Sequence, residues 1–335
     1  MKDLVRPYRL VVLTFFLVLV LAAFVILLQQ FPTVFDNKVV RSGSLAGKKE
    51  NSFWQAPDTA SIPKDNQGVL VRYGLRLIER TADYLGPQGN VIQISNGMNC
   101  QNCHLDAGTK LFGNNFGSVA ATYPIFRPRS GKAESIEKRI NDCMERSLNG
   151  QTLDSLSREM RAMVAYIQWL GRDIPKGKKA AGSGLVNMDF LPRAANPIAG
   201  KKLYLMKCQI CHGYSGEGQR LSAGANFIYP PLWGENSFNT GAGLYRISSL
   251  ARYIRTNMPR EATYEKPVLT EEEAWDIAAY VVSLPRPEKV FREDWPRIEL
   301  KPVDHPFGPY VDSFSEMQHK YGPFPTILNS AKEIK

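Results

Sequence analysis

Two copies of one short pattern, Cys-x-x-Cys-His, constrain the fold of this 335-residue chain more than any other feature. They read CQNCH at residues 100–104 and CQICH at residues 208–212. The pattern is the attachment signature of c-type haem, because two thiols one helical turn apart reach the two vinyl groups of one haem and the histidine reaches its iron. A disulfide or a zinc site would leave the histidine of both copies unexplained. The sequence therefore predicts two covalently bound haem c groups, with attachment cysteines and proximal histidines at Cys100, Cys103 and His104 (haem 1) and at Cys208, Cys211 and His212 (haem 2).

The surroundings of the two motifs follow the same plan. Residues 69–86 predict a helix that closes at Gly86-Pro87 before the first motif, and residues 196–211 predict a helix that enters the second. A long loop region and an amphipathic helix follow each motif, at 157–171 and 270–284. The apolar positions with helical spacing are Met160, Met163, Val164 and Ile167 in one helix and Ala274, Ile277, Ala278 and Val281 in the other, and Thr270 with Glu273 forms a capping box. The fold class is mainly α, with two cytochrome c-type domains in tandem.

The chain divides into six segments on this pattern. The stretch KGKKAAGSG, residues 176–184, is basic and glycine-rich and has the character of a linker, whereas the region from Pro285 is rich in proline and aromatic residues and reads as a strap packed over a domain. The predicted segments are an N-terminus with membrane anchor (1–30), a linker (31–66), a catalytic domain with haem 1 (67–175), a linker (176–195), an electron-transfer domain with haem 2 (196–288) and a C-terminal strap (289–335).

The N-terminal segment predicts export from the cytoplasm. Residues 10–28 are uncharged, and as a helix they would reach about 28 Å, roughly one bilayer core. Lys2, Arg6 and Arg9 precede the apolar run, which places the N-terminus in the cytoplasm and the rest of the chain outside. The run ends in QQFPTVF, which has no small-residue cleavage site, so we favour an uncleaved transmembrane anchor on the periplasmic side of the inner membrane. The alternative is a soluble periplasmic protein that remains after signal cleavage.

The net charge of +10 is spread along the whole chain. It is compatible with an ordinary solvated surface, or with attraction for a small anionic substrate, lipid head groups or an acidic partner. Nucleic acid is not an expected partner, because most of the chain lies outside the cytoplasm and no binding motif is present.

The second axial ligand of haem 2 is predicted from its position. Met258, in the stretch RTNMPRE, lies 46 residues after His212 and directly before a proline, in the loop ahead of the last amphipathic helix. This context is typical of the distal methionine of cytochrome c domains, although most methionines are core filler. Met206 is too close to its own haem motif, and we interpret it as helix packing.

The first domain has no equivalent Met-Pro. Other candidates for its distal ligand are Met144, Met160 and Met163, the last two in a helix core, and His305 and His319, which we interpret as structural residues of the strap. The corresponding position, 39 residues after His104, holds Cys143. A lone cysteine can be a buried, inert thiol, but a thiolate is also a strong iron ligand and a nucleophile whose pKa nearby cations lower.

The region around Cys143 is rich in charge. Between Arg127 and Arg146 there are six basic and four acidic residues, which can form a solvated helix with intrahelical pairs. Alternatively, Arg129 and Arg139 hold an anion beside the cysteine through charge-assisted hydrogen bonds.

Beyond these motifs, the sequence resembles the dihaem thiosulfate dehydrogenases, also called tetrathionate reductases, across nearly all of the exported part of the chain. The matching stretches are YGLRLIERTADYLGP, CQNCHLDAGT, RINDCMERSLNG, MVAYIQWL, PPLWGENSFNTGAG, NMP, AAYVVSLPRP and KPVDHPFGPY. The cysteine motif, joined to PPLWG-SFN-GAG at this spacing, is more specific than the haem motifs alone.

The resemblance implies roles for individual residues. It makes Cys143 the distal ligand of the active-site haem, places Arg129 and Arg139 at the substrate pocket, and makes Met258 the distal ligand of the electron-transfer haem. Some members carry a lysine just before this methionine that can itself bind the iron; here the position is Asn257, so a switch between these two ligands is not expected.

The resemblance also implies a reaction. Two thiosulfate anions join to give tetrathionate and two electrons, or the reverse, with a transient covalent adduct on the Cys143 sulfur as it detaches from iron. Electrons pass from haem 1 to haem 2 and on to a small electron-transfer cytochrome or a membrane oxidase. Two alternatives stay open from the residues alone: a membrane-anchored dihaem electron carrier without its own substrate, and an enzyme for another sulfane-sulfur compound.

Overall fold

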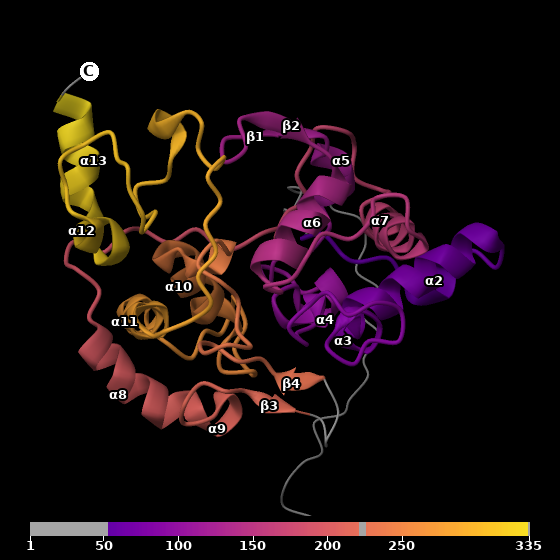
Figure 1. Cartoon of the computed structure of the whole chain (residues 1–335), viewed down its shortest axis with the longest axis horizontal. Helices are drawn as coiled ribbons and strands as arrows, with labels where there is room; N and C mark the ends of the chain where they lie inside the picture. Colours follow the sequence, from indigo (N-terminus) through magenta and orange to yellow (C-terminus); the bar gives the residue numbers. More distant parts are fainter. Residues whose placement is uncertain (1–52, 221–225, 334–335) are drawn as a thin grey trace, which may run out of the picture. The chain divides into compact units, whose positions relative to one another are not determined.

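The computed structural model describes residues 53–220 and 226–333, and these form one compact unit in which helices predominate (Figure 1). The first-domain elements are η1 (Thr59–Ser61), α2 (Asn66–Glu79), α3 (Thr81–Leu85), η2 (Cys100–Asn102), α4 (Leu105–Gly108), α5 (Val119–Thr122), β1 (Ile125–Arg127), β2 (Lys132–Glu134), α6 (Ile136–Arg146) and α7 (Arg158–Leu170). The remaining elements are α8 (Pro197–Lys207), α9 (Gln209–His212), β3 (Gln219–Arg220), β4 (Phe227–Tyr229), η3 (Gly243–Tyr245), α10 (Ile247–Asn257), α11 (Glu271–Ser283), η4 (Ile298–Leu300), α12 (Glu316–Tyr321) and α13 (Phe324–Glu333). Both sheets are two-stranded antiparallel hairpins, β1–β2 and β3–β4.

One helix crossing is repeated in the two domains. The helix that precedes each haem motif packs on the helix that ends the domain, α2 on α7 and α8 on α11. A glycine lies at each contact, because the two backbones approach too closely for a side chain. A Cβ added at Gly74 would lie 2.0 Å from the carbonyl oxygen of Ala162, and one at Gly200 would lie 1.8 Å from that of Asp276. The tandem repeat predicted from the motifs is therefore present in the packing.

We expect Gly74→Ala to lower the free energy of unfolding by about 1–3 kcal/mol, because α2 and α7 must separate to admit the methyl group. Thermal or denaturant unfolding of the haem-loaded protein, followed by far-UV circular dichroism, measures the change. Gly243→Ala is the matched control, since a Cβ there meets no heavy atom within 4 Å. Equal stability of the two variants would contradict the close crossing.

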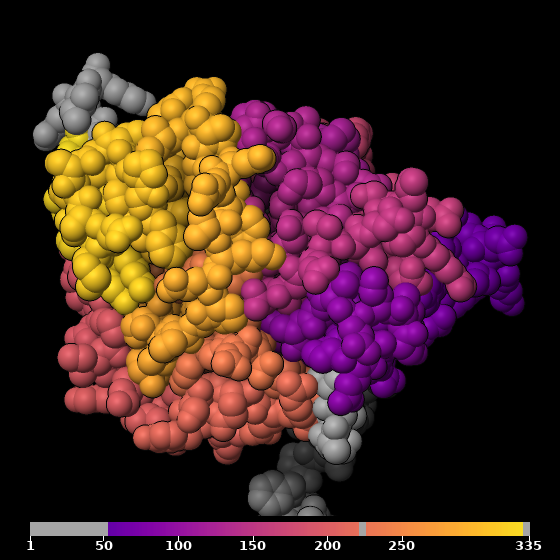
Figure 2. Space-filling view, viewed as in Figure 1, coloured from indigo at the N-terminus to yellow at the C-terminus, as the bar shows by residue number. Residues whose placement is uncertain are grey.

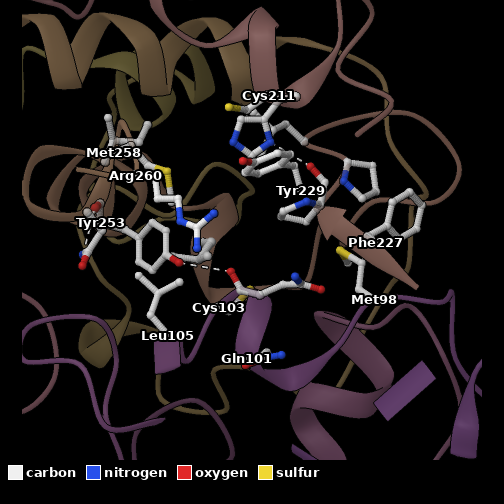
Figure 3. Close-up of a pocket in the computed structure, with 18 of the residues that line it drawn as sticks. Met98, Gln101, Cys103, Leu105, Cys211, Phe227, Tyr229, Tyr253, Met258 and Arg260 are labelled. Carbon is white, nitrogen blue, oxygen red and sulfur yellow. Dashed lines mark hydrogen bonds between the residues drawn. The ribbon is translucent and has the colours of Figure 1, made fainter. Parts of the chain in front are cut away.

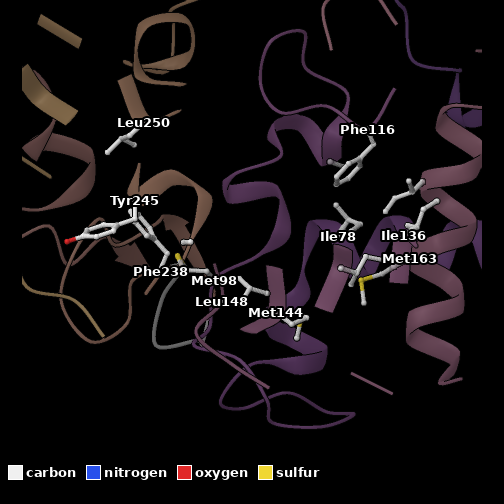
Figure 4. Packing of buried hydrophobic residues seen from close by; sticks show 14 of the residues in the cluster. Ile78, Met98, Phe116, Ile136, Met144, Leu148, Met163, Phe238, Tyr245 and Leu250 are labelled. Carbon is white, nitrogen blue, oxygen red and sulfur yellow. The ribbon is translucent and has the colours of Figure 1, made fainter. Parts of the chain in front are cut away.

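One buried hydrophobic cluster runs through both domains (Figure 4). Ile78 and Met163 belong to its first-domain part, and Tyr245 and Leu250 to its second-domain part. The predicted amphipathic helices are confirmed: α7 and α11 bury all eight apolar positions named above, and Thr270 with Glu273 forms the predicted capping box.

The segments between and after the domains make specific contacts. Within the glycine-rich stretch 176–184, the carbonyl of Gly182 accepts the backbone N–H of Phe112 at 2.8 Å, which fixes this stretch beside the first haem motif. The C-terminal strap is held by Asp294, which receives two hydrogen bonds of 2.8 Å from Arg146 on α6. Figure 2 shows these C-terminal residues, in yellow, spread over the second domain and reaching the first. The exact domain boundaries stay predictions.

One sequence-based expectation is wrong, and another falls outside the described residues. Met206 does not pack inside the fold: its side chain is 75% exposed. The reason is that Gly200 and Tyr204, one helical turn apart, face α11, and a residue two positions beyond Tyr204 points the opposite way. In residues 53–220 and 226–333, no helix is both apolar and long enough to cross a membrane, and the predicted anchor at 10–28 lies outside these residues.

Candidate active site

The first haem motif opens onto a cavity of about 400 Å³. Cys100, Cys103 and His104 line it together with Cys143 and Arg139 from α6. The His104 Nδ1–H donates to the backbone carbonyl of Asn114 at 2.5 Å, which leaves Nε2 as the nitrogen available for a metal. Two thiols, an oriented imidazole and a largely apolar wall are the groups that a covalently bound haem needs, so the residues fit haem 1.

Helix α6 carries the residues on the other side of this cavity. It begins after Ser135, whose hydroxyl accepts the N–H of Lys138 at 3.3 Å as an N-cap. Arg139 and Cys143 are four residues apart and therefore lie on one face of the helix, one turn apart. The regular helix thus places a cation and a thiol side by side in the cavity.

Cys143 and His104 both line this cavity, and His104 lies close enough to influence the Cys143 thiol. Burial alone would raise the pKa of the Cys143 thiol, but the Arg139 guanidinium and the nearby His104 outweigh it and lower the pKa to about 7. By contrast, burial raises the pKa of the Cys100 thiol to about 11. Cys143 is therefore prepared to be a thiolate, as an iron ligand or a nucleophile must be.

Arg139 is the cation that faces this thiol. Its guanidinium donates no hydrogen bond to another residue of the described ranges, and the residue is only partly exposed. The neighbouring Cys143 raises the pKa of Arg139, which keeps it charged. A partly buried guanidinium with free N–H groups beside a thiolate can bind an anionic substrate through charge-assisted hydrogen bonds.

Arg129 lies apart from the cavity wall. Its guanidinium donates to the carbonyl of Gly241 at 3.1 Å and lies 5.6 Å from the ring centroid of Trp295 in the strap. Burial and the nearby Arg146 lower the pKa of Arg129 to about 10. A role for Arg129 in substrate binding stays a prediction.

Sequence reasoning missed Arg127, which lines the cavity instead. Arg127 and Ile125 lie on one face of strand β1, and both contribute to the cavity wall. Alternation along a strand would place Arg129 on the same face as Arg127, two positions away, so the sequence alone could not separate them. The strand ends at Arg127, and Arg129 lies in the turn beyond it.

The second haem motif opens onto a cavity of about 640 Å³ (Figure 3). Cys208, Cys211 and His212 line it, and Met258 at the end of α10 lines it as well. The His212 Nδ1–H donates to the carbonyl of Pro230 at 2.9 Å, which again leaves Nε2 for a metal. The residues fit haem 2, with Met258 near enough to share the site.

The two haem motifs meet at this cavity, because residues of the first motif, including Cys103, line it too. The buried Tyr253 donates its hydroxyl to the carbonyl of Asn102, inside the first motif, at 3.1 Å (Figure 3). Asn257 on the same helix donates to the carbonyl of Phe112 at 3.0 Å. Helix α10, which ends beside Met258, is therefore fixed directly to the haem 1 segment.

Of the other ligand candidates, two methionines line the haem 1 cavity, and the remaining methionine and the two histidines line neither cavity. Met144 and Met163 are buried and line the haem 1 cavity, whereas Met160 is buried away from it. His319 donates from Nδ1 to the carbonyl of Val303 at 2.7 Å, and its other ring nitrogen contacts Asp312 at 3.0 Å. Neither His319 nor His305 lines either haem cavity.

Comparisons with known proteins agree with this arrangement. The family model of the SoxA/TsdA cytochrome c domain matches residues 90–175, and the cytochrome c family model matches residues 198–285. The two cytochrome c domains and the two covalently bound haem c groups are thereby confirmed.

Individual relatives and a solved structure point to one family. The chain is 41% identical to a thiosulfate dehydrogenase of Psychrobacter arcticus, with 72% of this chain and 71% of that protein covered. It is 36% identical to one of Allochromatium vinosum, with 69% and 83% covered. The structure of thiosulfate dehydrogenase TsdBA from Marichromatium purpuratum matches with a TM-score of 0.67 and 29% identity over 78% of this chain, which spans only 54% of that longer chain. The chain belongs to the thiosulfate dehydrogenase family of dihaem c-type cytochromes.

Proposed function

We propose that this protein is a thiosulfate dehydrogenase that converts two thiosulfate ions into tetrathionate, with electrons passing from haem 1 to haem 2. The observation that carries the proposal is the juxtaposition of Cys143, His104 and the unpartnered Arg139 in one buried cavity. A protein that only carries electrons needs a haem and a route for electrons, but it has no need of a partly buried anion-binding cation beside a thiolate. The relatives at 36–41% identity, which are named thiosulfate dehydrogenases, support the same substrate.

The chemistry balances over two steps at the Cys143 sulfur. In the first, a sulfur–sulfur bond forms between Cys143 and the sulfane sulfur of one thiosulfate, and two electrons leave. In the second, the sulfane sulfur of another thiosulfate attacks the bound sulfane sulfur; the bond to Cys143 breaks, and tetrathionate and the thiolate are released. The bound haems supply the one-electron acceptors for the first step.

The cationic residues make this encounter of anions possible. Two thiosulfate dianions repel each other and both repel a thiolate, so positive charge must be present before they meet. Arg139 lies beside Cys143, and Arg127 lines the same cavity. We propose that Arg139 binds the thiosulfate nearest the Cys143 sulfur and that Arg127 attracts the second thiosulfate as it approaches.

The ligands of the two irons complete the proposal. Cys143 would hold the iron of haem 1 together with His104, and Met258 would hold that of haem 2 together with His212; each side chain lines the corresponding cavity. A thiolate ligand lowers the potential of haem 1 relative to a methionine-ligated haem 2, which favours electron flow toward haem 2. The onward acceptor is a small cytochrome or a membrane oxidase, and we place the protein on the periplasmic side of the inner membrane, anchored through residues 10–28.

Anaerobic turnover of the purified, haem-loaded protein tests the proposal. We expect thiosulfate to reduce ferricyanide catalytically, with one tetrathionate formed for every two thiosulfates consumed. Tetrathionate with a reduced dye measures the reverse reaction in parallel. Intact haems without activity in either direction would refute the proposed function and favour an electron carrier or another sulfane-sulfur substrate.

A further inference from the structure

Helices α8 and α9 follow one another at the edge of the second domain (Figure 1), and together they carry a stripe of exposed apolar side chains. Ile198, Met206 and Ile210 are 74%, 75% and 79% exposed, although large apolar side chains are usually covered. Positions 198, 202, 206 and 210 follow a four-residue spacing, which places them on one side of a helix. The backbone N–H of Cys208 donates to the carbonyl of Tyr204 at 2.8 Å, so the helical path continues between α8 and α9.

The stripe lies against the attachment site of haem 2. Ile210 is one of the two residues between Cys208 and Cys211. The two cysteines line the haem 2 cavity, whereas Met206 and Ile210 do not. Cys208 and Cys211 would hold a haem in the cavity, and Met206 and Ile210, which lie within two residues of Cys208 but outside the cavity lining, would stay exposed.

The segment that carries the apolar stripe is basic. The segment Pro197–His212 contains three lysines and no acidic residue. Lys207 pairs with Glu273 on α11 at 3.1 Å. Lys201 and Lys202 are exposed and make no hydrogen bond or ion pair with any residue of the described ranges. Position 202 belongs to the stripe itself, so a lysine lies between its apolar members.

We propose that Ile198, Met206 and Ile210, with Lys201 and Lys202, form the docking surface for a small electron-transfer protein that accepts electrons from haem 2. The partner has acidic side chains around an apolar centre, because that surface complements this one. A small apolar centre with charged surroundings suits a brief encounter, in which charge steers association and little area is buried. A second copy of this chain would bring lysine against lysine, which disfavours self-association. The inference rests on the proposed function in assigning haem 2 as the electron exit.

The test compares a protein acceptor with a small-molecule acceptor. The wild-type holoprotein and the Met206→Glu and Lys202→Glu variants are supplied with thiosulfate, and the reduction of an acidic small c-type cytochrome and of ferricyanide is measured. We expect either substitution to lower kcat/KM for the cytochrome about 10-fold or more and to leave ferricyanide reduction unchanged. Leu156→Glu is the matched control, because Leu156 is 81% exposed on the first domain. Lys202→Glu should also make kcat/KM for the acidic cytochrome less sensitive to salt concentration. With a basic cytochrome, the same substitution should raise kcat/KM.

Several outcomes would overturn the docking surface. One is an unchanged kcat/KM for the acidic cytochrome in both variants. Another is that the variants change only binding to anionic phospholipid vesicles, which would make the stripe a membrane contact. A third is that they change only self-association in sedimentation, which would make it a contact between copies of this chain. If wild-type protein fails to oxidise thiosulfate, the proposed function fails separately, and dithionite-reduced protein still measures electron transfer to the cytochrome.

Discussion

Replacement of Cys143 by alanine is expected to abolish thiosulfate turnover while both haems remain attached. The thiol lies in the haem 1 cavity with His104, whereas the four attachment cysteines belong to the two motifs. Alanine removes both the sulfur that binds the sulfane group and the distal ligand, so no partial route remains. We expect kcat/KM to fall by roughly four orders of magnitude, as for other nucleophiles whose loss disables the whole catalytic unit.

The measurements separate catalysis from folding. Haem staining and the pyridine haemochrome spectrum count the attached haems, and the absorption spectrum of haem 1 should change while that of haem 2 is retained. Cys143→Ser keeps the shape of the side chain but offers a far weaker nucleophile and ligand, so it should be nearly as inactive. Substantial turnover by either variant would exclude a covalent role for Cys143.

Most of what could be predicted about the fold came from the two haem motifs. Each motif specifies a local backbone and a large apolar ligand, so helices must surround it, and the flanking periodicity of 157–171 and 270–284 is strong enough to identify them. The close crossings at Gly74 and Gly200 were not foreseen, because an isolated glycine in a helical pattern has several explanations.

The site was less predictable where it depends on which way a side chain points. Arg139 was expected at the pocket, and its four-residue spacing from Cys143 explains why it reaches the cavity. Arg127 and Arg129 differ by two positions across a short hairpin, and only tertiary structure shows that the first lines the cavity while the second contacts Gly241 and Trp295. The prediction that Met206 packs inside the fold was wrong for a related reason, because its position close to a haem motif does not show which side of the helix is covered.

Contacts between the domains could not be predicted from the sequence. The hydrogen bond from Tyr253 to Asn102 joins residues 151 positions apart, and no local pattern marks either partner. The same holds for the contact from Asn257 to Phe112. These bonds are nonetheless what places the haem 2 ligand beside the haem 1 segment, so the route between the two haems is a property of the packed chain.

Loss of the Arg139 charge is the second large effect that we expect. In Arg139→Gln, kcat/KM for thiosulfate should fall about 100-fold or more, because a buried anion loses its cationic partner. Reduction of the haems by dithionite needs no anion site. Its rate should therefore fall less than kcat/KM for thiosulfate. Lys138→Gln is the control: Lys138 is the adjacent residue, but it pairs with Asp142 and does not line the cavity.

The pH dependence of the same variants gives an independent test. Burial raises the pKa of Cys143, and Arg139 is the largest influence that opposes it and brings the value to about 7. Without that charge the pKa of the Cys143 thiol, when it is not bound to iron, rises, so the free thiolate is lost at neutral pH and returns only under alkaline conditions. The activity profile of Arg139→Gln should therefore shift to higher pH, whereas Arg139→Lys, which keeps the charge but not the paired N–H groups, should keep the wild-type profile at reduced kcat/KM. A profile of Arg139→Gln that coincides with the wild type would mean that Arg139 does not act on the Cys143 thiolate.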